Sequence, residues 1–239
     1  MGQFRFKRFS IDDSRCGMKV GTDGVLLGAW ADVEGVKNVI DIGCGSGLIS
    51  LMMAQRIPDA DIVGVEIDGD ACMDAISNVE SSPWRERIRI VNCDIADFNE
   101  VMKSPLLILS NPPFFTEALH SPDSTRSLAR HGEEFGVKEL VELSAGFMRS
   151  ESDSLAFIAP AGRDDEIEFM LSLHRLEVRR RTTVYSREGK APFRSLWQVG
   201  KDRGVDGGSI ENSYLCIRDK ENHLTKEYLN LTSDFYLDK

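Results

Sequence analysis

The fold is predicted by one stretch of the chain, Val39-Ile40-Asp41-Ile42-Gly43-Cys44-Gly45-Ser46-Gly47. It begins as a short apolar run with one acid and continues as three glycines that alternate with other residues. The apolar residues of the next segment, 48–57, recur with helical spacing, so the region predicts a strand, a tight turn and a helix. Glycine suits such a turn, because the chain reverses sharply there and a ligand can approach bare backbone at the start of the helix. The stretch therefore predicts a nucleotide-binding turn.

The spacing of the glycines indicates which nucleotide the turn binds. A dinucleotide fingerprint has G-x-G-x-x-G spacing, and here Leu48 stands where its third glycine should be. Asp41 places a carboxylate beside the turn, which repels a pyrophosphate and suits a cationic or amine-bearing ligand. Glu66 ends the next apolar run, where its carboxylate can accept hydrogen bonds from both hydroxyls of a ribose. This pattern predicts S-adenosylmethionine as the cofactor, with Asp41, Gly43, Gly45, Gly47 and Glu66 among the residues that bind it.

Strands and helices alternate along most of the chain. The predicted strands are 39–41, 62–66, 88–93, 106–109 and 155–159, and the predicted helices are 25–31, 48–57, 70–79, 137–148 and 164–173. This alternation predicts a doubly wound α/β fold with a mostly parallel sheet. Segments 176–185 and 193–199 alternate apolar with polar residues and predict an antiparallel hairpin at one edge, which makes seven strands in all. A short terminal strand is further expected over 213–217, and the aromatic and basic segment 4–9 predicts an edge strand or an arm that contacts nucleic acid.

The composition is that of an ordinary globular protein. The chain has 239 residues, of which 41% are hydrophobic and 28% charged, and no apolar run reaches the roughly 20 residues that cross a bilayer. Five cysteines are scattered without a C-x-x-C pair, so we expect reduced thiols, a cytoplasmic protein and no metal site. At this length we expect one domain, 1–239. Its parts are an N-terminal segment 1–37 that contributes to the site, a core over 38–201, and a C-terminal loop with the terminal strand over 202–239.

Polar residues stand at the ends of four successive predicted strands. They are Asp41, Glu66, Asp94 and Asn111. Ligands of open α/β sheets bind beyond the carboxyl ends of the strands. Four polar strand ends in succession are therefore expected to form one site.

A family resemblance rests on these residues and on Asn111-Pro112-Pro113-Phe114, which follows the strand at 106–109. The glycine turn, Glu66 and this tetrad resemble the class I S-adenosylmethionine-dependent methyltransferases, and among them the enzymes that methylate adenine N6 or a glutamine amide. With the segment 19–28 included, the chain is most similar, over nearly its whole length, to bacterial tRNA N6-adenine methyltransferases that act beside the anticodon of a valine tRNA.

The resemblance implies further residues at the cofactor. It places the turn Gly21-Thr22-Asp23 over the methionine end, and Asp94 as an acceptor for the adenine amine. Ile67 and Ile95 follow the two acids and belong with them in the cofactor site. Asp and Gly also form ordinary turns, so a structural role for the turn at 21–23 stays open.

The tetrad suits methylation of an aromatic amine. The lone pair of such an amine is delocalised into the ring, so the site must localise it. The Asn111 side-chain oxygen and the Pro112 carbonyl can accept both N–H groups and turn the lone pair toward the methyl group. Pro112 and Pro113 stiffen the turn, and Phe114 offers a flat face to a base swung out of its stack. An Asn-Pro-Pro sequence can also simply end a buried strand.

The distribution of charge indicates where RNA binds. The net charge of −10 alone argues against a nucleic-acid substrate, but residues 173–203 hold nine basic and three acidic side chains. Such a region can attract phosphates, although many charge runs are only solvated surface. The long polar segment 115–134 predicts a functional loop. The candidate tRNA-binding residues are Phe115, Arg126, Arg130, Arg179, Arg181, Arg187 and Lys190.

Three alternatives compete with a tRNA methyltransferase that acts as a monomer. A glutamine methyltransferase of a release factor has a similar tetrad, but usually with Tyr in place of Phe114, and about forty residues before the glycine turn are too few for its recognition domain. A non-catalytic protein that binds RNA or S-adenosylmethionine needs no intact tetrad. A dehydrogenase is disfavoured by Leu48.

Overall fold

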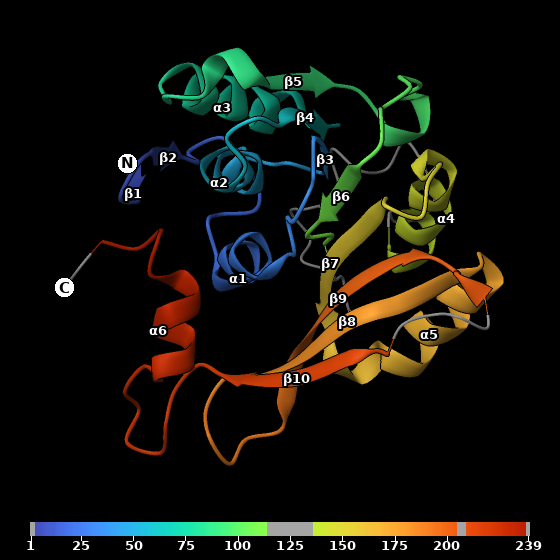
Figure 1. Cartoon of the computed structure of the whole chain (residues 1–239). Helices are drawn as coiled ribbons and strands as arrows, with labels where there is room; N and C mark the ends of the chain where they lie inside the picture. The colour runs from blue at the N-terminus through green and yellow to red at the C-terminus, as the bar shows by residue number, and fades with distance from the viewer. Residues whose placement is uncertain (1–2, 114–135, 205–208, 238–239) are drawn as a thin grey trace, which may run out of the picture.

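The main sheet runs through the middle of the protein, with helices on both faces (Figure 1). The computed structural model describes residues 3–113, 136–204 and 209–237. Among these residues the sheet has eight strands in the order β10-β8-β9-β7-β6-β3-β4-β5. The strands are β3 (Asn38–Ile42), β4 (Asp61–Glu66), β5 (Ile88–Asn92), β6 (Leu106–Ser110), β7 (Ser154–Pro160), β8 (Leu176–Tyr185), β9 (Pro192–Lys201) and β10 (Glu211–Cys216).

The predicted doubly wound α/β fold is confirmed. All neighbouring strands pair in parallel except β9, which pairs antiparallel with β7 and with β8. Strands β3, β4, β5, β6, β7, β8 and β10 therefore end at the same edge of the sheet, which we call the carboxyl edge. The helices are α1 (Thr22–Trp30), α2 (Leu48–Arg56), α3 (Gly69–Glu80), α4 (Val137–Phe147), α5 (Asp164–Leu173) and α6 (Lys226–Thr232).

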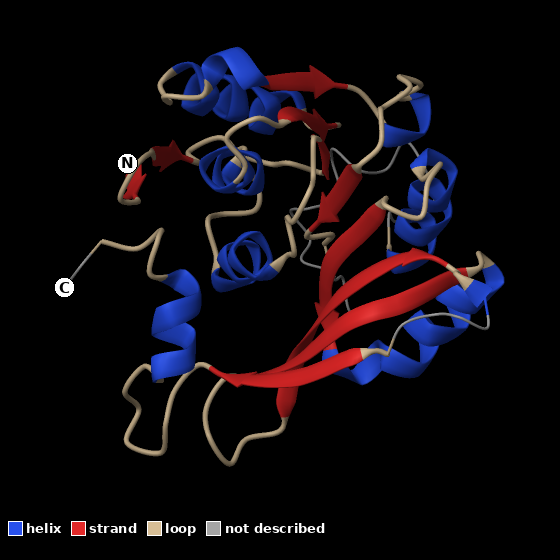
Figure 2. Cartoon of the chain, viewed as in Figure 1, coloured by secondary structure: helices blue, strands red, loops and turns tan. Residues whose placement is uncertain are grey.

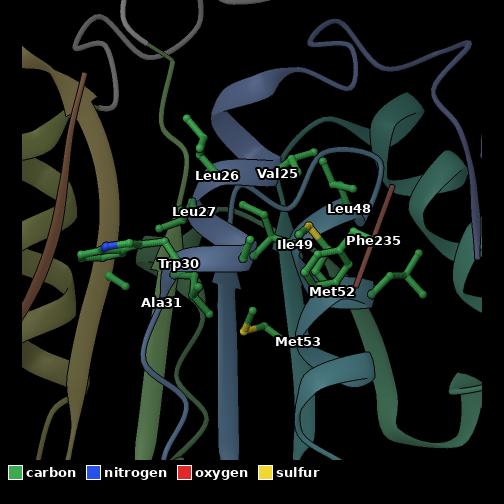
Figure 3. Close-up of a cluster of buried hydrophobic side chains, with 14 of the residues drawn as sticks. Val25, Leu26, Leu27, Trp30, Ala31, Leu48, Ile49, Met52, Met53 and Phe235 are labelled. Carbon is green, nitrogen blue, oxygen red and sulfur yellow. The ribbon is translucent and has the colours of Figure 1, made fainter. Parts of the chain in front are cut away.

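Alternating side chains of the central strands build two cores, one on each face. Val39 of β3 packs in the core beneath α1 and α2, whereas Ile40 packs in the core beneath α4 and α5. Successive residues of a strand point to opposite faces, so a strand covered on both faces reads as a continuous apolar run. Figure 3 shows part of the first core, with Leu27 of α1 and Met52 and Met53 of α2. The Trp30 ring points away from α2, and its N–H donates to the Thr182 hydroxyl of β8 at 2.8 Å.

The sheet differs from the sequence prediction at one end. The terminal strand is β10, which pairs in parallel with β8 and makes an eighth strand where seven were expected. The hairpin partner β9 consequently lies inside the sheet, between β7 and β8. The strand expected over 213–217 is found at 211–216, but side chains 211–214 are exposed, so no apolar pattern indicated its place in the sheet. Helix α6 was not expected, and it packs near α1 at the same end of the sheet.

The N-terminal segment forms a small sheet of its own, separate from the large one (Figure 2). Strand β1 (Gln3–Arg5) pairs antiparallel with β2 (Ser10–Asp12). Between them Phe6 and Phe9 stack with ring centroids 4.6 Å apart, and both are buried. The aromatic residues of this segment therefore anchor the hairpin on the core.

Candidate active site

The glycine turn connects β3 to α2, as the sequence predicts. Gly43, Gly45 and Gly47 have φ angles of 67°, 55° and 81°, a region that side chains with a Cβ rarely adopt. The N–H groups of Gly43 and Cys44 donate to the carbonyl of Val65, at 2.8 and 3.1 Å, which fixes the turn to β4. The alternation of glycines is therefore required by the backbone.

Asp41 lies beneath the turn instead of facing outward from it. Its side chain is fully buried, and Oδ2 accepts hydrogen bonds from the backbone N–H and the hydroxyl of Ser50, at 2.9 and 2.7 Å. Ser50 is in the first turn of α2, whose N-cap, Gly47, has no side chain to offer. Asp41 thus caps the helix from the neighbouring strand. Oδ1 of Asp41 has no hydrogen-bond partner among the described residues.

Burial raises the pKa of Asp41 from 3.8 to about 7, with a smaller contribution from the charge of Glu66 and opposition from the two bonds to Ser50. The folded carboxyl keeps its proton to a higher pH than the unfolded one. Its contribution to the free energy of unfolding is therefore full below about pH 3.8 and is lost as the pH rises through about 7.

We expect Asp41→Asn to weaken this pH dependence, because the amide keeps an acceptor for Ser50 but does not ionise. Urea unfolding at pH 5 and pH 8 measures the free energy of unfolding of parent and variant. The parent should lose more stability than the variant between the two, by roughly 1.4 kcal/mol for each pH unit between pH 5 and the folded pKa of about 7. Asp59→Asn, at an exposed position, is the control. An equal loss in parent and Asp41→Asn would contradict the prediction.

Glu66 connects the turn to the segment after β4. Its side chain is 7% exposed; Oε2 accepts from the N–H of Gly45 at 2.8 Å, and Oε1 accepts from the N–H of Asp68 at 2.9 Å. An ionised carboxylate has about four acceptor positions, so two bonds leave it able to accept others. The next residue, Ile67, is 59% exposed and presents an apolar surface beside Glu66.

Asp94 follows β5 and caps the 3-10 helix η2 (Ile95–Asp97) by accepting from the N–H of Ala96 at 2.9 Å. Ile95 is buried. Asn92, at the end of β5, donates to the carbonyls of Glu66 and Ile67, at 2.7 and 3.1 Å. This asparagine, which the sequence analysis did not single out, holds the ends of β4 and β5 together.

Asn111 stands at the carboxyl end of β6, directly beside the end of β3. The Ser110 hydroxyl donates to the carbonyl of Ile42 at 2.9 Å and joins the two ends. Asn111 is partly exposed and Pro112 is buried. The Asn111 Nδ2 atom lies 3.8 Å from the sulfur of Met18. Phe114 and Phe115 lie outside the described residues, as do Arg126 and Arg130.

The turn at 21–23 begins α1. Gly21 is the N-cap, and no side chain caps the first turn of the helix. Asp23 accepts from Nε of Arg194 at 2.8 Å, so its carboxylate already has a cationic partner. A Cβ on Gly24 would lie 3.1 Å from Leu48 and 4.0 Å from the Asn111 amide nitrogen. Helix α1 therefore starts close to both the glycine turn and Asn111.

The sheet order brings these groups into one row. Strands β6, β3, β4 and β5 are consecutive neighbours, so Asn111, the glycine turn, Glu66 and Asp94 follow one another along the carboxyl edge. Strands are about 4.8 Å apart, and the row is therefore roughly 14 Å long. Bare glycine backbone, a carboxylate with spare acceptor positions and an exposed isoleucine suit a nucleoside cofactor with an attached amino acid.

The predicted tRNA-binding arginines of β8 have partners within the protein. Arg181 lies 5.1 Å over the ring of Trp197 and donates to Glu168 at 2.7 Å. Arg179 donates to the carbonyl of Glu151 at 2.6 Å. Arg187 and Lys190 are instead exposed, in the loop between β8 and β9. Of these four predicted tRNA-binding residues, Arg179 and Arg181 therefore bond to other parts of the protein. Arg187 and Lys190 are exposed.

Two findings apply to all the residues that the structure describes. In residues 3–113, 136–204 and 209–237 no group of three or more His, Cys, Asp and Glu side chains could hold a metal ion. None of the helices in these ranges is long and apolar enough to cross a membrane.

Comparison with known proteins identifies the family. Residues 19–137 match the model of the methyltransferase small domain. A tRNA1(Val) (adenine(37)-N6)-methyltransferase of Tolumonas auensis is 38% identical over 98% of this chain and 96% of the relative. One of Bacteroides thetaiotaomicron with the same name is 37% identical over 98% of this chain and 97% of the relative.

Solved structures show the same fold at low identity. A predicted O-methyltransferase of Agrobacterium tumefaciens superposes with a TM-score of 0.64 at 17% identity, covering 89% of this chain and 96% of that one. TYW2 of Pyrococcus horikoshii, solved in complex with MeSAdo, superposes with a TM-score of 0.55 at 14% identity, covering 80% of this chain and 67% of that one. The predicted class, an S-adenosylmethionine-dependent methyltransferase, is thereby confirmed, and the chain belongs to the family of the tRNA1(Val) (adenine(37)-N6)-methyltransferases.

Proposed function

We propose that this protein transfers a methyl group from S-adenosylmethionine to N6 of an adenine in tRNA, at position 37 of a valine tRNA as in the names of its relatives. The observation that carries the proposal is the position of Asn111 and Pro112. They follow β6, the direct neighbour of β3, so two acceptors for an amine stand beside the glycine turn. We further propose that the enzyme works as a monomer, as one domain, in the cytoplasm.

The cofactor site that we propose follows the row along the carboxyl edge. Glu66 accepts from the ribose hydroxyls, using the acceptor positions that Gly45 and Asp68 leave open. Asp94 accepts from the adenine amine. The apolar side chains of Ile67 and Ile95 and the backbone of Gly43, Gly45 and Gly47 complete the site.

We assign the methionine end to the turn at 21–23. Because the Asp23 carboxylate is paired with Arg194, the useful groups of this turn are its backbone N–H groups. They stand at the start of α1, where no side chain caps them, and the start of a helix favours a carboxylate.

The chemistry follows from the acceptors at the tetrad. S-adenosylmethionine supplies an electrophilic methyl group on a sulfonium ion. Oδ1 of Asn111 and the carbonyl of Pro112 accept the two N–H groups of the adenine amine and direct its lone pair toward that methyl group. Pro113 stiffens the turn, and Phe114 stacks on the base. The methylated nitrogen becomes acidic and loses its proton to water, so positioning carries most of the rate.

We assign the main phosphate contacts to two adjacent loops, 186–191 and 217–225, which we call the loop pair. They leave the carboxyl edge together, because β8 and β10 are parallel and Tyr185 pairs with Cys216. The N–H of Glu188 donates to the carbonyl of Arg218 at 2.9 Å, and the side chain of Glu188 lies 3.2 Å from the Lys220 amine. The exposed basic residues of the loop pair are Arg187, Lys190, Arg218 and Lys220.

Four strand spacings, about 19 Å, separate β10 from β6. The loop pair is therefore placed to hold phosphates at some distance along the RNA from the target adenine. Arg179 and Arg181 have protein partners, which favours a structural role for them.

We expect the double substitution Arg187→Ala/Lys190→Ala to weaken tRNA binding and to flatten its salt dependence. Each lost phosphate contact should lower the slope of log affinity against log salt by about 0.9. The measurement is tRNA affinity between 50 and 200 mM salt. Arg181→Ala is the matched control: it should lower the melting temperature and leave the slope unchanged. Equal slopes for the parent and the double variant would remove the loop pair from the RNA interface.

The proposed reaction is tested with labelled S-adenosylmethionine. The protein is incubated separately with bulk tRNA, ribosomal RNA and a release factor, and the labelled nucleoside is identified after digestion. We expect label only in tRNA, as N6-methyladenosine. Label confined to the release factor, or absent from every substrate, would overturn the proposal.

A further inference from the structure

Two polar side chains of α3 hold down a segment of the N-terminal region. The segment, residues 12–20, leads from β2 to the start of α1. Asp74 and Asn78 are only 2% and 5% exposed, and they lie one turn apart on the same face of α3. Burial of such groups is unfavourable unless they form hydrogen bonds. The hydrogen-bond partners of Asp74 and Asn78 therefore indicate the structural role of the two residues.

The Asp74 carboxylate is bonded to the middle of the segment. Oδ2 accepts from the N–H of Arg15 at 2.7 Å and from the N–H of Cys16 at 3.1 Å. Oδ1 accepts from the Arg15 guanidinium at 3.0 Å, and the Arg15 side chain is 54% exposed. These bonds join α3 to the N-terminal segment and do not support the helix itself.

The Asn78 amide connects the segment to the glycine turn. Its Oδ1 accepts from the N–H of Asp12 at 2.8 Å, and its Nδ2 donates to the carbonyl of Asp12 at 2.8 Å. The same Nδ2 donates to the carbonyl of Ser46 at 2.9 Å. One buried amide thus links β2, α3 and the turn between β3 and α2.

The far part of the segment touches two elements of the proposed site. Asp13 closes it into a loop by accepting from the N–H of Val20 at 2.8 Å. Within this loop the Cys16 sulfur lies 3.4 Å from the place of a Cβ on Gly45. Met18 is 49% exposed, and its sulfur lies 3.8 Å from Nδ2 of Asn111.

We propose that Asp74 and Asn78 are positioning residues of the active site. They hold segment 12–20 across the carboxyl edge as a wall of the cofactor site, and Met18 on this segment orients the Asn111 amide. A sulfur that accepts from Nδ2 leaves Oδ1 directed to the target amine. This inference rests on the proposed function, because it concerns the same cofactor and the same amine.

The wall also leads directly into the turn at 21–23, so its anchors act on the methionine end of the cofactor. A segment released from α3 must be ordered again when the cofactor binds, and that ordering lowers the affinity. Conversely, bound cofactor should hold the segment in place, since coupling between two events is reciprocal.

The first test measures how firmly segment 12–20 is held, and it requires no methyl transfer. Asp74→Ala removes three hydrogen bonds and should weaken binding of S-adenosylhomocysteine by calorimetry about tenfold or more. Trypsin should cleave the variant faster after Arg15 and Lys19, as followed by mass spectrometry, and S-adenosylhomocysteine should slow this cleavage. Asp70→Ala, at an exposed position of the same helix, is the control and should change neither quantity.

A milder variant covers the case in which Asp74→Ala does not fold. Arg15→Ala removes only the exposed side of the ion pair. It should weaken binding of S-adenosylhomocysteine and speed cleavage after Lys19 by smaller factors, and cleavage is followed at Lys19 alone because the substitution removes the other trypsin site. Unchanged affinity and unchanged cleavage in a folded Asp74→Ala or Arg15→Ala variant would overturn the anchoring role. If the parent itself fails to bind S-adenosylhomocysteine, the proposed cofactor is wrong, which distinguishes failure of the function from failure of the inference.

The second test concerns Met18. Met18→Leu keeps the side-chain volume but removes the sulfur acceptor, so kcat for tRNA methylation should fall severalfold while the affinity for S-adenosylhomocysteine stays the same. Met73→Leu is the matched control, because Met73 is also 49% exposed. A kcat equal to that of the control would exclude Met18 from orienting Asn111.

Discussion

Replacing Asn111 with alanine is expected to lower the single-turnover rate of methyl transfer by about a hundredfold or more, with cofactor affinity close to that of the parent. The substitution removes one of two acceptors for the target amine, whereas the residues proposed to bind the cofactor lie at or just after the ends of β3, β4 and β5 and at the start of α1. The lost interaction is one that counts most in the transition state, so the loss should appear in kcat. The measurement is methylation of saturating tRNA by the folded enzyme loaded with S-adenosylmethionine.

Asn230→Ala is a suitable control for this experiment, because Asn230 is exposed on α6. Its rate should match that of the parent. A rate for Asn111→Ala near the parent's would mean that Asn111 only ends β6, and the amine mechanism would have to be abandoned. A large loss of cofactor affinity would instead place Asn111 in the cofactor site.

Glu66→Ala is expected to weaken cofactor binding by roughly 10- to 150-fold, the equivalent of the 1.5–3 kcal/mol carried by hydrogen bonds to a charged group. Two effects act in the same direction. The ribose hydroxyls lose their acceptor, and the N–H groups of Gly45 and Asp68 lose the partner that holds the turn in place. Calorimetry with S-adenosylhomocysteine measures the affinity, and the melting temperature shows the structural part of the effect.

Glu80→Ala provides the comparison for this variant, because Glu80 is the exposed last residue of α3. It should bind S-adenosylhomocysteine as the parent does. If folded Glu66→Ala also binds with unchanged affinity, Glu66 serves only to fix the turn. The proposed cofactor site along the carboxyl edge would then lack its ribose acceptor.

The fold was predictable because its signals are local. The apolar run that becomes β3 is nearly continuous, with one acid in it, and its residues alternate between two cores as those of a strand covered on both sides must. The three glycines adopt positive φ angles, and that requirement is visible in the sequence because few other residues tolerate it. Consecutive parallel strands then place Glu66, Asp94 and Asn111 at one edge, since all of them end there.

The strand β10 was expected over 213–217, but no local signal indicated its place beside β8. Four of the six side chains of β10 are exposed, and its place is determined by backbone pairing with β8. Helix α6 has seven residues, of which Tyr228 and Thr232 are buried, too short a run for a helical period to stand out. Asp41 shows a related limit: its position beside the turn was predicted, but its burial against Ser50 depends on how α2 packs over β3.

The sequence by itself therefore specified which strand ends carry the polar groups, because backbone sterics and side-chain period act between near neighbours. The packing of the whole fold determined which of those polar groups already form hydrogen bonds within the protein, and which residues position them. Asp74 meets Arg15 across 59 residues, Asn78 meets Asp12 across 66, and Met18 meets Asn111 across 93. A hydrogen bond requires two atoms about 3 Å apart, and for residues so distant in the chain that proximity arises only when α3, the sheet and the N-terminal segment pack together.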